Sequence, residues 1–312
     1  MLFICKNKTN YQFNLTHQGK RKVWHWLILA LLSIIWGTSY ILMKKGLRSF
    51  TPYQIGALRI IITAICLLPV ALKNLPRLNR ENITSVIIIG YLGNAIPAFL
   101  FPVAQTHISS SLAGMLNSLS PVFTLIIGII IYNRQAIRSQ IAGVILGLIG
   151  AAGLLYSGSF TFNFYGLFVV TATLLYGFSS NEVSRAKGLN GLQITALAFL
   201  LSVPLALAYL PFSGITHAFS ASGSLKSFGF IAILSVIGSA TAQALYYMLI
   251  RDTTPVFASV VTYFIPVVST MWGIADGETL LPSMLISVTF ILAGVFFINR
   301  PDFILRLIRV KR

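Results

Sequence analysis

Residues 24–72 read WHWLILALLSIIWGTSYILMKKGLRSFTPYQIGALRIIITAICLLPVAL, and this stretch decides the fold. An apolar run over 24–43 is followed by a short basic turn with Lys44, Lys45 and Arg48, and a second apolar run starts just after Pro52. The first run has about 20 residues, or roughly 30 Å of helix, which matches the hydrocarbon thickness of a bilayer. The stretch therefore predicts a transmembrane helical hairpin, and the rest of the chain continues its pattern.

The composition extends this prediction to the whole chain. Of the 312 residues, 56% are hydrophobic and 9% are charged, and the mean hydropathy is +0.83. Soluble domains carry about 25% charged residues, so we expect an integral membrane protein that has the lipid bilayer as its surroundings. The net charge of +17 does not indicate a nucleic-acid partner. Lys and Arg lie mainly in the two tails and in short loops, where they set membrane topology.

Ten apolar runs follow one another along the chain, joined by connections that are mostly short. Short connections make neighbouring helices antiparallel. The fold class predicted is therefore all-α, with ten transmembrane helices. The runs cover residues 24–43, 53–72, 83–105, 109–132, 140–158, 165–182, 192–211, 227–250, 255–275 and 282–299.

The distribution of basic residues predicts the orientation in the membrane. Counted along the ten runs, 18 of the 23 Lys and Arg residues fall on one side and four on the other, with Arg59 inside a run. Because the basic side is normally cytoplasmic, both termini are expected in the cytoplasm of a multi-pass protein of the plasma (inner) membrane. Residues 1–23 and 300–312 are then basic cytoplasmic tails.

The two halves of the chain repeat each other. At a spacing of 140, Trp36, Gly37 and Ser39 fall on Tyr176, Gly177 and Ser179, and at a spacing of 145 four further pairs match: Gly93 with Gly238, Phe101 with Tyr246, Ala113 with Ala258 and Pro121 with Pro266. Each half, 24–158 and 159–299, holds five runs. An odd number makes the second half enter from the opposite face, so two inverted five-helix repeats are predicted, with a substrate site at their interface near the bilayer midplane.

These motifs resemble the EamA family of the drug/metabolite transporter superfamily. The resemblance covers about 24–299 and rests on Trp36-Gly37-Thr38-Ser39, on Ala57-Leu58-Arg59, on Pro121, on a glycine-rich fifth helix and on the weaker second copy. It implies export or exchange of a small metabolite, such as an amino acid, without ATP. The second copy departs from the family at Tyr176, where Trp is frequent, and at Ala198 or Phe199, where no second Arg stands.

Two prolines interrupt matching helices. Pro121 and Pro266 each remove a backbone hydrogen bond and so free the carbonyls of Asn117 and Thr262. In hydrocarbon a free carbonyl either finds a partner or lines a cavity. Two interpretations stay open here: a pair of matched breaks that lines the binding site, or packing kinks whose carbonyls bond to a neighbouring Ser or Thr.

Polar and aromatic residues on the third and eighth helices predict the cavity wall. Asn94 shares a helix face with Phe101 in the first half, and Gln243 shares one with Tyr246 in the second. Together with four further aromatic residues they predict an aromatic-lined substrate site that has few charges. The alternative is that Asn and Gln only join helices by hydrogen bonds. The four aromatic residues are Trp36, Tyr40, Tyr176 and Tyr263.

Arg59 is the charged residue that lies well inside an apolar run. An Arg at the centre of a membrane helix costs about 2.5–3.5 kcal/mol, so it needs a partner or water. One interpretation is that it binds a carboxylate of the substrate. The other is that its side chain extends to the nearby outer surface or caps backbone carbonyls.

The sequence offers no motif for catalysis. We find no phosphate-binding loop, no paired histidines and no paired carboxylates, so neither enzyme activity nor a metal or other cofactor is expected. A membrane-embedded enzyme of lipid or acyl chemistry is the alternative function. Glu182, with Arg185 three residues on, is interpreted as a surface ion pair, so transport is expected to proceed without obligatory proton coupling. The glycines from Gly143 onward predict close helix packing within a monomer, with a dimer contact as the alternative.

Overall fold

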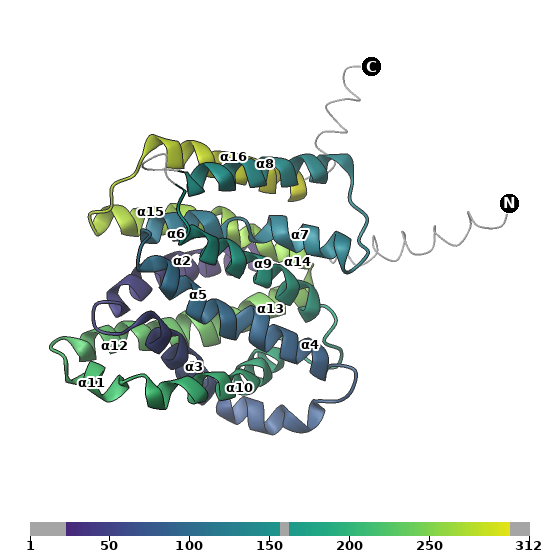
Figure 1. Ribbon diagram of the computed structural model, residues 1–312. Helices are drawn as coiled ribbons and strands as arrows, with labels where there is room; N and C mark the ends of the chain where they lie inside the picture. Colours follow the sequence, from purple (N-terminus) through teal and green to yellow (C-terminus); the bar gives the residue numbers. More distant parts are fainter. Residues whose placement is uncertain (1–22, 157–161, 300–312) are drawn as a thin grey trace, which may run out of the picture.

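The computed structural model describes residues 23–156 and 162–299, and within these ranges the chain is helical and has no strand (Figure 1). The helices are α2 (Val23–Gly46), α3 (Pro52–Asn74), η1 (Leu75–Arg77), α4 (Ile83–Ile88), η2 (Ile89–Ala95), α5 (Ile96–Gln105), α6 (Ser110–Asn117), α7 (Ser120–Ile130), α8 (Arg138–Leu155), α9 (Gly166–Val183), α10 (Gly191–Tyr209), η3 (Leu210–Phe212), α11 (Ile215–Ser220), α12 (Ser224–Ile233), η4 (Leu234–Thr241), α13 (Ala242–Asp252), α14 (Pro255–Ala258), η5 (Ser259–Tyr263), α15 (Ile265–Ala275) and α16 (Pro282–Asn299). The two predicted tails lie outside the described residues.

The first hairpin forms as predicted, with one correction. Helix α2 continues to Gly46, so Lys44 and Lys45 lie in its last turn and not in the connecting turn. Cations are favourable there because the helix dipole is negative at its C-terminal end. Helix α3 starts with a capping box, in which Thr51 accepts from the backbone N–H of Gln54 and Gln54 Oε1 accepts from the backbone N–H of Thr51.

Nine helical segments of the described chain are long and apolar enough to cross a membrane. The integral membrane class is therefore confirmed. Helix α9 is a further helix of 18 residues, and its C-terminal turns carry polar side chains. The connection between the predicted runs 192–211 and 227–250 is not a plain loop, because it contains the short helix α11 and the start of α12.

Matching positions of the two halves share the same irregular backbone. The π-helical segment η2 (Ile89–Ala95) interrupts the third predicted helix, and η4 (Leu234–Thr241), which follows at the repeat spacing of 145, interrupts the eighth. Breaks also precede both prolines, between α6 and α7 and between η5 and α15. Such π-helical interruptions are frequent at functional sites.

Helices α8 and α16 lie side by side along one edge of the bundle (Figure 1). Their glycines bring the two backbones into contact: a Cβ on Gly143 would stand 2.5 Å from the carbonyl oxygen of Gly294, and one on Gly150 would stand 2.5 Å from that of Ser287. The predicted packing face of the fifth helix is thus used within the chain.

Candidate functional site

A central cavity lies between the helices of the two halves. About 660 Å³ of space there is not filled by protein atoms, and this figure includes open solvent at the mouth. The first half contributes eight lining residues and the second half contributes eight more. They are Trp36, Ser39, Tyr40, Met43, Arg59, Phe101, Asn117 and Ser120, and Tyr176, Ser179, Ser180, Gln243, Tyr246, Tyr247, Val261 and Thr262.

Ten of the sixteen lining residues are related in pairs by the spacings of 140 and 145. Five pairs at the repeat spacing all line the cavity. Three pairs have the spacing of 140, namely Trp36 with Tyr176, Ser39 with Ser179 and Tyr40 with Ser180. Two pairs have the spacing of 145, namely Phe101 with Tyr246 and Asn117 with Thr262. Equivalent positions of the two halves therefore face the same space.

Aromatic rings form two connected walls of this cavity. The ring of Trp36 meets that of Tyr246 edge-on at 5.0 Å between centroids, and Phe101 lies 5.9 Å from both Tyr40 and Tyr176. Such arrangements are favourable for aromatic pairs.

Hydrogen bonds hold these rings in place. Trp36 Nε1 donates to the carbonyl of Gly238 in η4 at 3.0 Å, and the hydroxyls of Tyr247 and Ser179 are 3.1 Å apart. The Trp36 bond joins α2 to the π-helical segment of the other half. The Trp36 ring is therefore fixed by a contact between the halves, and the Tyr247 ring by one within the second half.

Arg59 contributes the positive charge of the lining. Its Nε donates to the hydroxyl of Ser239 in η4 at 2.7 Å. Arg59 is itself a lining residue of the cavity, which disagrees with the interpretation that its side chain extends to the outer surface or caps backbone carbonyls. At the position that the spacing of 140 relates to Arg59, the second half has Phe199, which is buried.

The two prolines do not line the cavity. Both are buried, and each freed carbonyl accepts a hydrogen bond from a serine: Ser120 Oγ donates to the carbonyl of Asn117 at 2.8 Å, and Ser118 Oγ to that of Thr262 at 3.1 Å. Of the two interpretations open for the carbonyls, the structure supports the kink bonded to a serine. The side chains of Asn117 and Thr262 nevertheless face the cavity.

The structure brings together seven of the eleven predicted site residues: Trp36, Tyr40, Arg59, Asn117, Tyr176, Gln243 and Tyr246. The other four lie outside the lining. Pro121 and Pro266 sit at the breaks, Tyr263 packs beside the core, and the Nδ2 of Asn94 is buried without a hydrogen-bond partner among the described residues.

Sequence reasoning missed several small and polar lining residues. Ser39 and Ser179 were already matched by the repeat spacing, and that spacing also relates Tyr40 to Ser180, so extending the match would have found Ser180. Nothing in the sequence alone distinguishes Met43 or Val261 from ordinary core residues.

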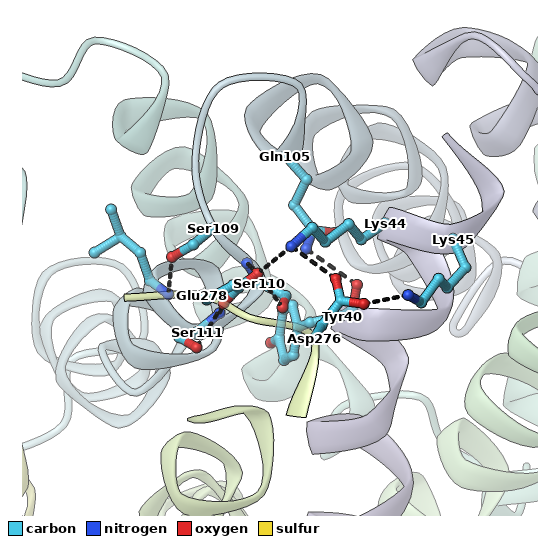
Figure 2. A network of polar contacts seen from close by, with 10 residues as sticks. Tyr40, Lys44, Lys45, Gln105, Ser109, Ser110, Ser111, Asp276 and Glu278 are labelled. Atoms are coloured by element: carbon cyan, nitrogen blue, oxygen red, sulfur yellow. Dashed lines mark hydrogen bonds and ion pairs between the residues drawn. The ribbon is translucent and has the colours of Figure 1, made fainter. Parts of the chain in front are cut away.

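At one end of the bundle, a polar network joins the halves (Figure 2). Lys44 Nζ lies 2.8 Å from Oε1 of Glu278 and 2.9 Å from Oδ2 of Asp276, and Lys45 also pairs with Asp276. Glu278 accepts from the backbone N–H and hydroxyl groups of Ser110 and Ser111 at the start of α6. We call this set the outer network, because the charge count predicts that this end faces outward.

The outer network sets the ionisation of its two acids. Burial alone would raise the pKa of Glu278, but hydrogen bonds from Lys44, Ser111 and Ser110 lower it to about 2. The hydrogen bonds from Lys45 and Lys44 also lower the pKa of Asp276. Both carboxylates are therefore charged at neutral pH.

A second network, which we call the inner network, joins the halves at the opposite end, near the loop between α7 and α8 (Figure 1). Glu182 accepts from the hydroxyls of Ser85 and Tyr132 and from Arg185 Nη1 at 3.1 Å. The predicted pair with Arg185 is present, but the Glu182 side chain is only 5% exposed, so it is not a plain surface pair. Burial and the bond to Glu182 raise the pKa of Tyr132.

These features define a class: a multi-pass membrane protein of the transporter type, with its cavity between the helices of the bundle. The sequence model of the EamA-like transporter family matches residues 24–156 and again residues 163–300. The chain belongs to this family, as the sequence resemblance indicated.

Relatives along most of the chain carry transporter names. An uncharacterized transporter of Archaeoglobus fulgidus is 27% identical over 279 residues, which are 88% of this chain and 98% of that protein. The uncharacterized inner membrane transporter YedA of Escherichia coli K12 is 27% identical over 258 residues, 81% of this chain and 83% of that protein. The S-adenosylmethionine/S-adenosylhomocysteine transporter of Chlamydia muridarum is 22% identical, with 88% of this chain and 92% of that protein covered.

Proposed function

We propose that the protein is a secondary transporter that moves a small metabolite, such as an amino acid or a related compound, across the plasma membrane as an exporter or exchanger. The observation that carries the proposal is the central cavity with its five lining pairs at the repeat spacing. A site shared by two repeats near the midplane is the arrangement of many secondary transporters. The family and the names of the relatives support transport rather than catalysis.

The proposed architecture is ten membrane helices in two inverted halves, with α9 as the tenth span. The matching segments η2 and η4 and the double match of the family model support it. The excess of Lys and Arg on one side supports cytoplasmic termini.

Alternating access is the proposed mechanism, and the two networks are its proposed gates. The outer network ties the end of α2 to the loop before α16, and the inner network ties the end of α9 to the segment after α7. By the repeat spacing, the ends of α2 and α9 are equivalent places in the two halves. Opening one network while the other stays closed would expose the cavity to one side at a time.

The Chlamydia relative supports the substrate class. Its named substrates are amino-acid derivatives. The aromatic rings and amide groups of the cavity fit a molecule that has both polar and apolar parts. We therefore propose amino acids and their derivatives as the first compounds to test.

The test is counterflow in proteoliposomes that contain the purified protein. Vesicles are preloaded with a mixture of unlabelled amino acids and S-adenosylmethionine. They are then diluted into solutions that each contain a trace amount of one labelled compound. We expect saturable uptake of at least one compound, lost in Tyr246→Ala and in Gln243→Ala but kept in Tyr156→Ala, a tyrosine exposed outside the cavity. No protein-dependent uptake of any compound would contradict the proposal, and conversion of a probe would favour the membrane-enzyme alternative.

A further inference from the structure

Arg59 is the asymmetric element of an otherwise repeated cavity. Five lining pairs match between the halves, but the position that the spacing of 140 relates to Arg59 is occupied by Phe199. The sixteen lining residues include no other Lys or Arg and no Asp or Glu. The cavity therefore carries one uncompensated positive charge on one wall.

The guanidinium is held in a fixed orientation by its inner nitrogen. Nε donates to Ser239 Oγ at 2.7 Å, and Ser239 is almost fully buried within η4. In the described part of the chain, the two terminal nitrogens of Arg59 make no hydrogen bond and no ion pair. The edge that remains free is the fork that binds a planar carboxylate through two parallel hydrogen bonds.

A buried cation without a counter-ion is costly, so it needs a partner when the cavity closes. In the described residues, each of the five carboxylates lies elsewhere: Asp276 and Glu278 in the outer network, Glu182 in the inner network, and Glu81 and Asp252 exposed. The described part of the protein thus supplies no anion to Arg59, so we expect the counter-ion to come from the cargo.

The lining also limits what kind of anion fits. One guanidinium matches one negative charge, and the lining holds no second cation for a phosphate ester with two charges. Six of the other lining residues are aromatic, including Trp36, Phe101 and Tyr176. They favour an apolar or aromatic body and also accept an ammonium group over a ring face.

Resting on the proposed transport function, we propose that the cargo carries a carboxylate that binds the free edge of Arg59, with its apolar body between the aromatic walls. Arg59 is then the residue that determines specificity for carboxylates. A neutral or cationic molecule with the same body leaves the guanidinium unpaired and binds more weakly.

The test compares three probes that share one phenyl body: 3-phenylpropionate, 3-phenylpropanamide and 3-phenylpropylamine. Binding to the purified full-length protein is measured by isothermal titration calorimetry. We expect the carboxylate to bind at least tenfold more tightly than the amide, and the amine to bind most weakly. Arg59→Gln should abolish this preference and Arg59→Lys should keep part of it. Arg134→Gln, a cation outside the cavity, should leave it unchanged.

Equal affinity for carboxylate and amide, or no binding of either, would overturn the inference, and this comparison needs only the unmodified protein. The outcome is separable from that of the transport proposal. Carboxylate-selective binding without flux in vesicles would overturn transport alone. Flux that is equally fast for the amide would overturn the role of Arg59 alone.

Discussion

Nζ of Lys44 and Oε1 of Glu278 lie 2.8 Å apart, and this ion pair connects the end of α2 to the loop before α16. The lysine side chain is 34% exposed and that of the glutamate is 6% exposed. A partly buried pair of this kind, with further hydrogen bonds to the carboxylate, holds two elements together more firmly than a surface pair.

Removing this contact should open the outer end of the cavity. In a background with Cys5 and Cys66 replaced by Ser, we expect Ser39→Cys to react faster with a membrane-impermeant maleimide from outside when Glu278→Gln is added. The rate should rise severalfold, up to roughly tenfold, which corresponds to about 1.4 kcal/mol. The exposed Asp252→Asn is the matched control. Equal labelling rates in all three proteins would show that the outer network is not a gate.

The stabilisation from Glu278 should depend on pH in a defined window. Its pKa in the folded protein is about 2, below the ordinary value of 4.5. A lowered pKa stabilises the fold fully above the ordinary value, and the effect is lost as the pH falls toward the folded value. The melting temperature of the wild type should therefore exceed that of Glu278→Gln by a constant amount above about pH 4.5. The difference should shrink below it, as measured by circular dichroism. A difference that already disappears near neutral pH would contradict this assignment.

A proton gradient should not drive the transporter. Among the described residues, no Asp, Glu or His lines the cavity, and Glu182 is engaged by three donors in the inner network. Proteoliposomes with an imposed pH gradient should show the same steady-state level of the counterflow substrate as vesicles without one. Uphill accumulation that a protonophore and Glu182→Gln both abolish would establish proton coupling instead.

The close contact between α8 and α16 should be sensitive to a single methyl group. In Gly150→Ala the new Cβ would lie 2.5 Å from the carbonyl oxygen of Ser287, so the two helices must separate. Overpacking of this kind costs about 1–3 kcal/mol of folding free energy. Gly229→Ala in α12 meets nothing within 4 Å and is the control. We expect a lower melting temperature for the first variant only. An unchanged melting temperature in Gly150→Ala would mean that the two helices separate without cost.

The orientation is testable by labelling from outside intact cells. Asn79 and Ser222 are both exposed and lie on sides that the charge count assigns oppositely. With Cys5 and Cys66 replaced by Ser, Ser222→Cys should react with the membrane-impermeant maleimide in intact cells. Asn79→Cys should react only after the cells are lysed. Reaction of Asn79→Cys in intact cells would reverse the predicted topology.

The apolar runs predicted the helices well because hydrocarbon demands long, continuous apolar segments. The runs at 83–105, 255–275 and 282–299 have the same limits as three of the spanning segments. The errors lie where polar residues extend a helix past its apolar part, as Lys44 and Lys45 do at the end of α2. The short helix α11 was also missed, because six residues carry little periodic signal.

The site was predictable as far as the repeat reached. Equivalent positions in two related halves face the same space, so the spacings of 140 and 145 indicated Trp36 with Tyr176 and Phe101 with Tyr246. The hydrogen-bond partner of Arg59 was not predictable, since Ser239 is far away in the sequence. The burial of Glu182 likewise depends on Ser85 and Tyr132 from other segments.

The glycine contact between α8 and α16 also bears on how such a molecule moves. Backbones that touch without intervening side chains have little room to slide or rotate, whereas pairs separated by flexible side chains adjust readily. We therefore expect α8 and α16 to stay in contact during transport, while the remaining helices change position around them.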